Sequence, residues 1–383
     1  MPASSIPYTV VADTRAFKEM LASLTRSERL AVDIEADSLY HYFDKVCLIQ
    51  ISTEAETFIL DPLAVEDLSA LGPLMSDPEV EKVFHAAGYD IFCLRRDYHF
   101  TFASIFDTHL AAQLMGHEHL GLSALMEQFL GVAHSKRRQR DDWSRRPLDS
   151  EQLEYAAMDT HHLLHLRDVL ETQLVRKGRL SWAHEEFAVS AAGIQEEKEF
   201  DPEGFRRIKG SRELSLQELV VLRALYLLRD RYARDLDVPP FKVLNNPVLL
   251  DLVRRPPRSP RDMFRRSGIS FRVARKFSSE IYHTIQRARS EDPSRLVMPP
   301  RRDAKPHSHE AKVRLEKLKV WRQKKAAELQ LHVGVVFPGN LLEMLAASPP
   351  PDVAALEALD GMRRWRAREF GAEVLETLHT LEA

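Results

Sequence analysis

The carboxyl-terminal half of this 383-residue chain contains an internal repeat, which limits the folds that this half can adopt. At an offset of 93 residues the same amino acids recur, as Gly268 and Gly361, Ala274 and Ala367, Arg275 and Arg368, Phe277 and Phe370, and Glu280 and Glu373. In each copy these residues follow a Pro-Pro break and have helical spacing. We therefore predict two similar all-helical modules, over residues 211–290 and 311–383.

The amino-terminal half has a different pattern. Short apolar runs that are typical of strands occur at residues 30–35, 46–52, 57–61, 82–85 and 104–108. Helical spacing appears between these runs and dominates from about residue 109 onward. We expect an α/β domain over residues 1–190 and a linker over 191–210. A second linker, basic and rich in proline, is expected over 291–310.

The sequence gives no sign of a membrane protein. No apolar run reaches the roughly 18 residues that a membrane span requires. The amino terminus also lacks a charged segment followed by an apolar one, which a secretion signal would have. We therefore expect a cytoplasmic protein without a membrane partner. Separately, we expect it to be a monomer.

Positive charge is concentrated in two windows, although the formal net charge is only -3. Residues 133–147 hold six Lys or Arg and two Asp, and residues 254–266 hold six Arg and one Asp. Such windows favour a polyanionic partner, although either one alone could be a solvated basic loop. Trp143 could stack on a base or pack in the core. The candidate nucleic-acid contacts of the first window are Lys136, Arg137, Arg138, Arg140 and Trp143.

Two carboxylates lie two residues apart in the segment LAVDIEADS, at Asp33 and Glu35. Alternate residues of a strand project from the same face, so these two carboxylates project together. Their repulsion is unfavourable unless a cation neutralises it or their pKa values rise. Mg²⁺ and Mn²⁺ prefer oxygen ligands, so the pair is a candidate metal site. A solvated face of an edge strand would also explain it.

Further acids occur at the start of one predicted helix and within another. Asp90 lies in the first helical turn after the strand KVFH, where the helix dipole alone would favour an acid. Tyr155 and Asp159 are four residues apart and share one helix face, although they could form only a hydrogen-bonded core pair. With Asp33 and Glu35, the two aspartates would supply about four negative charges, which two divalent cations would balance.

The motifs DIE (33–35), HAAGYD (85–90) and YAAMD (155–159) resemble the three exonuclease motifs of the DEDD superfamily. The Tyr-x-x-x-Asp form of the third motif is typical of the tyrosine subgroup. With FDTHLAAQL (106–114) and the segment 136–159, the sequence is most similar to the ribonuclease D family. The two repeated modules resemble helicase and RNase D carboxyl-terminal (HRDC) domains, so the resemblance covers nearly the whole chain.

The resemblance implies a ribonuclease H-like mixed sheet flanked by helices, followed by two all-α HRDC-like domains. It implies that two Mg²⁺ or Mn²⁺ ions are bound by Asp33, Glu35, Asp90 and Asp159. One ion, with Tyr155, would activate a water that attacks the terminal phosphodiester, and the other would stabilise the departing 3' oxygen. Supporting roles are expected for His85 and Asp107. The other histidines lack the spacing of a metal site, so we expect no zinc.

The resemblance further implies a 3'-5' exoribonuclease that releases nucleoside 5'-monophosphates from RNA with a free 3' end. Expected substrates are tRNA precursors and other structured small RNAs. A DNA exonuclease of the same superfamily is the nearest alternative, because both nucleic acids share the phosphodiester. A non-catalytic nucleic-acid-binding protein is a more remote alternative. Because of window 254–266, the first module is expected to contribute most of the affinity.

Overall fold

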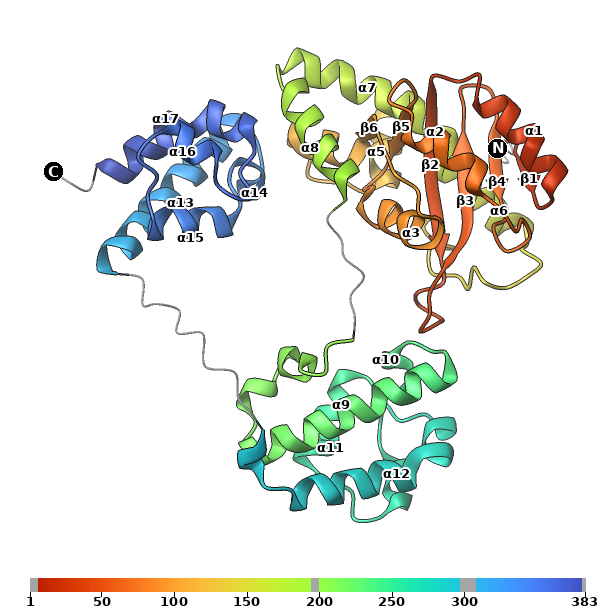
Figure 1. Ribbon diagram of the computed structural model, residues 1–383, viewed down its shortest axis with the longest axis vertical. Coiled ribbons are helices and arrows are strands. Elements are labelled where there is room, and N and C mark those ends of the chain that lie inside the picture. Colours follow the sequence, from red (N-terminus) through yellow and green to blue (C-terminus); the bar gives the residue numbers. More distant parts are fainter. Residues whose placement is uncertain (1–5, 194–199, 297–307, 381–383) are drawn as a thin grey trace. The chain divides into compact units, whose positions relative to one another are not determined.

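The computed structural model describes residues 6–193, 200–296 and 308–380 (Figure 1). The chain divides into two compact units, which are described separately below. The first unit consists of Met1–Ala36, Val46–Gln195 and Asp303–Ala383. The second unit consists of Asp37–Lys45 and Glu196–Arg302.

A six-stranded mixed sheet forms the centre of the α/β domain in the first unit. Its strands in chain order are β1 (Thr9–Val11), β2 (Arg29–Ala36), β3 (Val46–Ser52), β4 (Thr57–Leu60), β5 (Glu81–Phe84) and β6 (Ile105–Asp107). The spatial order is β1-β4-β3-β2-β5-β6. Because β2 pairs antiparallel with β3 and parallel with β5, it is an interior strand. The edge-strand explanation of Asp33 and Glu35 is therefore wrong.

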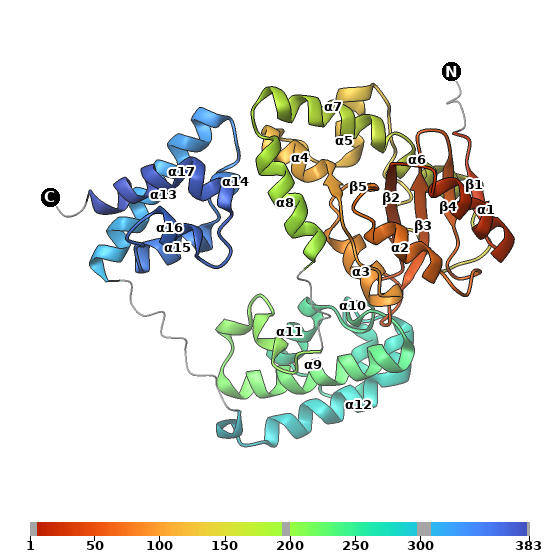
Figure 2. The same ribbon diagram turned by 45° about the horizontal axis from the view of Figure 1, so that its top comes forward.

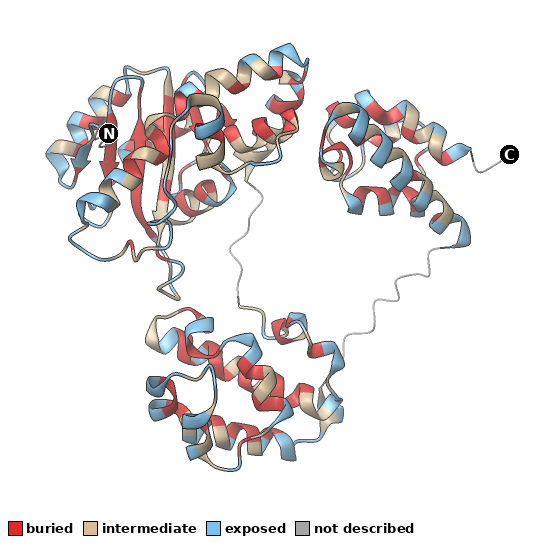
Figure 3. Ribbon diagram, turned by 180° about the vertical axis from the view of Figure 1, so that it is seen from behind, coloured by how far each residue is buried: buried red, intermediate tan, exposed pale blue. Residues whose placement is uncertain are grey.

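Helices cover both faces of the sheet. Successive side chains of β2 project alternately toward one face and the other, and so contribute to two different cores. Val32 and Ile34 pack in a core that also contains residues of α1 (Thr14–Leu24) and α3 (Gly88–Tyr98). Ala31 packs in a core on the other side, with α7 (Leu163–Arg176). Since side chains alternate along a strand, Asp33 and Glu35 project from the same face as Ala31. Figure 3 shows that buried residues predominate along these central strands.

The second unit contains the first helical module. Its elements are α9 (Leu216–Leu236), α10 (Pro240–Val243), α11 (Asn246–Arg254) and α12 (Phe271–Ser290). Figure 2 shows α9 and α12 lying side by side, and their apolar faces share one buried core. Phe205 is fully buried in that core, although it lies within the predicted linker 191–210. That end of the predicted linker is therefore part of the packed module.

The second helical module is part of the first unit. Its elements are α13 (His309–Leu329), α14 (Val333–Val336), α15 (Gly339–Ala347), α16 (Val353–Glu357) and α17 (Arg364–His379). The module packs on α8 (Leu180–Ala192), where Trp182 stacks on Trp365 with ring centroids 4.4 Å apart. Glu185 also accepts a hydrogen bond from the backbone N–H of Trp365, at 2.9 Å. Of the predicted linker 291–310, residues 297–307 lie outside the described residues.

None of the helices in the described part of the chain has both the length and the apolarity that crossing a membrane would require.

Candidate active site

Three of the four predicted metal ligands meet on one face of the sheet. Asp33 and Glu35 come from β2, and Asp159 comes from α6 (Ser150–His161). One carboxylate oxygen of each residue lies within 4.8 Å of the corresponding oxygens of the other two. A strand and a helix that are far apart in the sequence therefore form a single acidic cluster.

Two local features of α6 bring Asp159 to the sheet. Asp149 caps the helix by accepting a hydrogen bond from the backbone N–H of Gln152 at 2.8 Å, and the Gln152 side chain accepts one from the N–H of Asp149. This capping box fixes where the helix begins. Ala156 and Ala157 are fully buried in a core that also contains Leu48 of β3. Small side chains at this contact allow the helix to approach the strands closely.

Asp90 lies in the first turn of α3 and is buried, but it is not within the group of three close carboxylates. Its charge nevertheless contributes to raising the pKa values of both Asp33 and Glu35. The Oδ2 atom of Asp90 is buried and has no hydrogen-bond partner among the described residues. Such an oxygen normally needs a partner, and a cation could serve as one.

The electrostatics of the cluster also favour a cation. Burial, together with the charges of Asp159 and Asp90, raises the pKa of Asp33 well above its usual range. Burial and the same two charges do the same to Glu35. These raised pKa values mean that the ionised forms of the acids are unfavourable without compensation. All of the donor atoms are carboxylate oxygens, which suits Mg²⁺ or Mn²⁺ rather than zinc.

Tyr155 lies one helical turn before Asp159 on α6 and is partly buried. Burial raises the pKa of its phenol, and the charges of Asp159, Glu35 and Asp33 raise it further. The phenol therefore keeps its proton at neutral pH. In that state it can donate a hydrogen bond beside the acidic cluster.

His134 is a part of the site that the sequence analysis missed. Its Nε2 atom lies 2.7 Å from Oδ1 of Asp159, and its ring stacks on Tyr155 with centroids 5.1 Å apart. The side chain of His134 is only 6% exposed. No spacing pattern pointed to this residue, because it lies in a loop that comes 25 positions before Asp159 in the chain.

Asp107 and His85 make structural contacts around the start of α3. The carboxylate of Asp107 accepts hydrogen bonds from the backbone N–H groups of Ala86 and Ala87, each at 3.0 Å. It also caps α4 (Thr108–Met115). Asp107 thus orients the turn that leads into Asp90.

His85 lies beside that turn and forms a hydrogen bond with Oγ1 of Thr108 at 3.0 Å. Burial lowers the pKa of His85 to about 3, and the charges of His109 and Lys136 also contribute. His85 is therefore neutral at physiological pH. These properties suit a scaffold position better than a proton shuttle.

The basic side chains of window 133–147 differ in how far they are exposed. Lys136, Arg137 and Arg140 are exposed. Arg138 instead forms ion pairs with Asp141 at 3.0 Å and with Glu151 at 2.5 Å. Its charge is therefore partly neutralised within the protein.

Trp143 does not have the exposed ring that stacking on a base would require. It is 1% exposed and packs in the core that contains residues of β3 and α6. Base stacking by Trp143 is therefore wrong, and the core-packing alternative is the one observed. Its apolar surface supports α6 instead of contacting a ligand.

Comparison with protein families matches both halves of the chain. A 3'-5' exonuclease model matches residues 8–175, and an HRDC domain model matches residues 218–285 and 311–378. The ribonuclease D of Gluconacetobacter diazotrophicus is 30% identical over 371 residues, which cover 96% of this chain and 91% of that protein.

Solved structures give the same fold. The catalytic core of RRP6 from Trypanosoma brucei has a TM-score of 0.68 and 29% identity, covering 75% of this chain and 81% of that chain. The RNase D of Escherichia coli has a TM-score of 0.70 and 21% identity, covering 98% of this chain and 99% of that chain. The predicted architecture, a mixed sheet flanked by helices and followed by HRDC domains, is therefore confirmed.

Proposed function

This chain belongs to the ribonuclease D family and is a 3'-5' exoribonuclease, and we propose that four of its acids hold two divalent metal ions, Mg²⁺ or Mn²⁺. The acids are Asp33, Glu35, Asp90 and Asp159. The observation that carries this proposal is the approach of three carboxylates to within 4.8 Å on an interior strand and a packed helix. The unpartnered, buried oxygen of Asp90 supports it.

When bound, a pair of such ions stabilises both the attacking and the leaving oxygen of an in-line displacement at phosphorus. The protonated phenol of Tyr155 orients the attacking water by a hydrogen bond. His134 holds the carboxylate of Asp159 in position, and Asp107 holds the turn before Asp90. Attack of water on the terminal phosphodiester releases a nucleoside 5'-monophosphate and leaves a new 3' hydroxyl on the RNA.

The substrate that we propose is RNA with a free 3' end, such as a tRNA precursor or another structured small RNA. Lys136, Arg137 and Arg140 would contact the phosphates. The effect of Lys136 on the pKa of His85 supports a position of this basic loop beside the HAAGYD segment. We propose that the protein acts as a cytoplasmic monomer.

The carboxylate cluster alone does not separate RNA from DNA, because it acts on a group that both contain. Family membership favours RNA over the DNA exonuclease alternative. The non-catalytic alternative is disfavoured, because the four acids and Tyr155 are all present and the family is enzymatic.

The test is digestion of a 5'-labelled tRNA precursor with a 3' extension, with and without Mg²⁺ or Mn²⁺. A DNA strand of the same sequence is the control. We expect stepwise, metal-dependent shortening of the RNA from its 3' end and slower shortening of the DNA. Equal or faster digestion of the DNA would overturn the choice of RNA, and digestion in excess chelator would overturn the metal site.

A further inference from the structure

The first helical module carries two exposed aromatic rings that contact each other. Phe264 lies in the short 3-10 helix Pro260–Arg265, and Phe271 is the first residue of α12. Their side chains are 45% and 71% exposed, and their ring centroids lie 5.6 Å apart in an edge-to-face arrangement. Phenylalanine is usually buried, so an exposed pair of rings in contact indicates a surface that binds something.

Each ring is followed in the sequence by an exposed arginine, Arg265 after Phe264 and Arg272 after Phe271. Within the described residues, neither guanidinium has an ion pair or a side-chain hydrogen bond. Their neighbour Arg266 differs, because it forms an ion pair with Asp251 at 2.5 Å. The two exposed arginines therefore have free charge to offer to a ligand.

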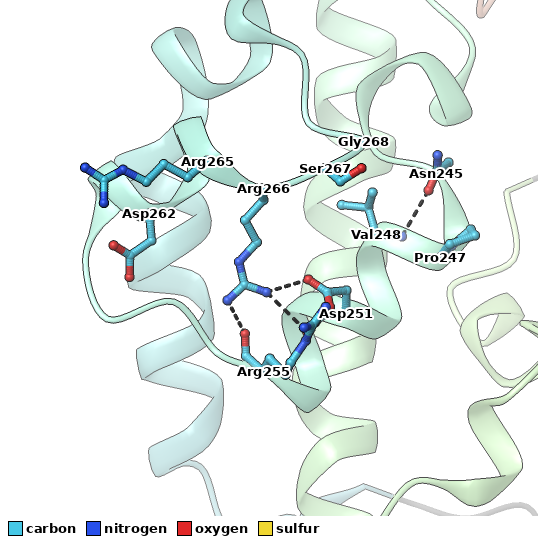
Figure 4. Close-up of a pocket in the computed structure, with 10 residues that line it drawn as sticks. All are labelled: Asn245, Pro247, Val248, Asp251, Arg255, Asp262, Arg265, Arg266, Ser267 and Gly268. Carbon is cyan, nitrogen blue, oxygen red and sulfur yellow. Dashed lines mark hydrogen bonds and ion pairs between the residues drawn. The ribbon is translucent and has the colours of Figure 1, made fainter.

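Arg265 also lines a polar pocket of about 640 Å³ in the first module. Arg255 and Arg266 line the same pocket and are both held by Asp251 (Figure 4). Figure 4 shows the side chain of Arg265 extending away from Asp251. Asp251 thus pairs with two arginines of this pocket, whereas Arg265 has no ion pair among the described residues.

We propose that Phe264, Arg265, Phe271 and Arg272 form a binding surface, called here the Phe-Arg surface, for a single-stranded segment of the RNA substrate. This inference rests on the proposed function, which makes RNA the substrate. Every base has an aromatic face and can stack on a phenylalanine ring without regard to sequence. The neighbouring guanidinium groups can pair with the phosphates of the same nucleotides.

The charge of the module favours RNA over an apolar protein segment as the occupant. Window 254–266 holds six Arg and one Asp, and it includes Phe264 and Arg265. An apolar partner would gain from the two rings but would have to desolvate the neighbouring arginines without pairing them. A polyanion with stacked bases satisfies both the rings and the charges.

The repeat provides a comparison within the same chain. At the offset of 93 residues, the four residues of the Phe-Arg surface correspond to Glu357, Ala358, Arg364 and Trp365. The second module thus lacks both phenylalanines. Trp365 is 4% exposed and stacks on Trp182, so this aromatic ring cannot accept a base. The Phe-Arg surface is a property of the first module alone.

The experiment compares the affinity of the full-length chain for a fluorescent oligouridylate RNA, without divalent metal, at several salt concentrations. The first variant combines Phe264→Ala with Phe271→Ala, and the second combines Arg265→Ala with Arg272→Ala. Loss of two stacking rings, each of which contributes about 1 kcal/mol or more, should weaken binding at least about 30-fold and leave the salt dependence unchanged. Loss of two phosphate contacts should lower the slope of log affinity against log salt by about 1.4.

Phe241→Ala is the matched control, because Phe241 is an exposed phenylalanine of the same module, 52% exposed, and lies on α10. It should bind as the wild type does. The single variant Phe271→Tyr leaves Phe264 unchanged and keeps an aromatic ring at position 271. Its affinity for RNA should therefore match that of the wild type. Unfolding midpoints of all variants are measured alongside, and they should lie close to that of the wild type because each substituted side chain is at least partly exposed.

The Phe-Arg surface is ruled out as an RNA site if the double phenylalanine variant binds RNA as tightly as the wild type. It is also ruled out if Phe241→Ala weakens binding as much. Digestion of RNA by the wild-type protein tests the proposed function separately. If the wild type digests RNA and the double variant binds normally, the proposed function stands and this inference fails.

Discussion

The imidazole of His134 contacts Asp159 through Nε2, 2.7 Å from Oδ1, while its face stacks on the ring of Tyr155. A single side chain outside the three exonuclease motifs thus orients both functional residues of the third motif. The hydrogen bond holds the Asp159 carboxylate in place beside the carboxylates of Asp33 and Glu35. The positions of the side chains in the acidic site therefore depend on a loop residue as well as on β2 and α6.

Replacing His134 should weaken the binding of metal ions or lower the activity that depends on them. His134→Ala removes the hydrogen bond to Asp159, and loss of such an outer partner typically costs about 10-fold to 100-fold in metal affinity or activity. Titrating exonuclease activity with Mn²⁺ should show a higher half-saturating concentration. His134→Gln retains a hydrogen-bond donor and should lie nearer the wild type. Identical titration curves for the alanine variant and the wild type would contradict this role.

Replacing Asp33 should separate binding from catalysis. Asp33→Asn removes a metal ligand from the middle of the cluster, so turnover should fall by several orders of magnitude. RNA binding, measured by fluorescence anisotropy, should persist because the basic surfaces are unchanged. Glu79→Gln, a change at an exposed acid, is the control and should retain full activity. Wild-type turnover by Asp33→Asn would show that the acids are not the catalytic centre.

Tyr155→Phe should lower kcat far more than it changes KM. The phenylalanine ring can still stack on His134, so only the hydroxyl that orients water is lost. Groups that act in this way typically contribute about 100-fold to 10,000-fold. Single-turnover rates and separately measured affinities would distinguish the two effects. Equal losses in both, or none in either, would argue against a role in orienting water.

The metal-free protein should become less stable as the pH rises above the usual range of carboxyl groups. The pKa values of Asp33 and Glu35 are raised in the folded state, so the folded protein holds protons that the unfolded chain releases. The stability from these protons is fully present below the unfolded pKa values, at about 4, and is lost as pH rises through the folded values.

Urea denaturation in chelator, between about pH 5 and pH 8, would measure this decline. Asp33→Asn should make it shallower, because one of the repelling charges is gone. Added Mn²⁺ should reduce it in the wild type, because the ions compensate the charges. The same decline in all three samples would show that other groups cause it.

Local spacing identified the parts of the site that lie on regular elements. The two-residue spacing of Asp33 and Glu35 correctly placed both on one strand face, and the four-residue spacing of Tyr155 and Asp159 placed both on one helix. It could not show that β2 is interior, because that depends on pairing with β3 and β5. His134 escaped notice for the same reason, since its contacts exist only after α6 packs.

Short or irregular segments were also hard to predict from the sequence. The strand β1 has three residues and was not predicted, because it is too short to show an alternating pattern. Trp143 lies in a strongly charged window, yet its large apolar ring packs in the core. Phe205 behaves similarly within the predicted linker, where its neighbours are polar. In both cases one large apolar side chain outweighs the composition of its surroundings.

The stacking of Trp182 on Trp365 affects how the nuclease domain would behave alone. A protein cut after α8 would present the ring of Trp182, now 6% exposed, to water, and Glu185 and Glu186 would lose the partners that they bind on α17. An uncovered aromatic surface of this kind promotes self-association. We therefore expect the second module to keep the nuclease domain soluble by covering α8, independently of any contact with RNA.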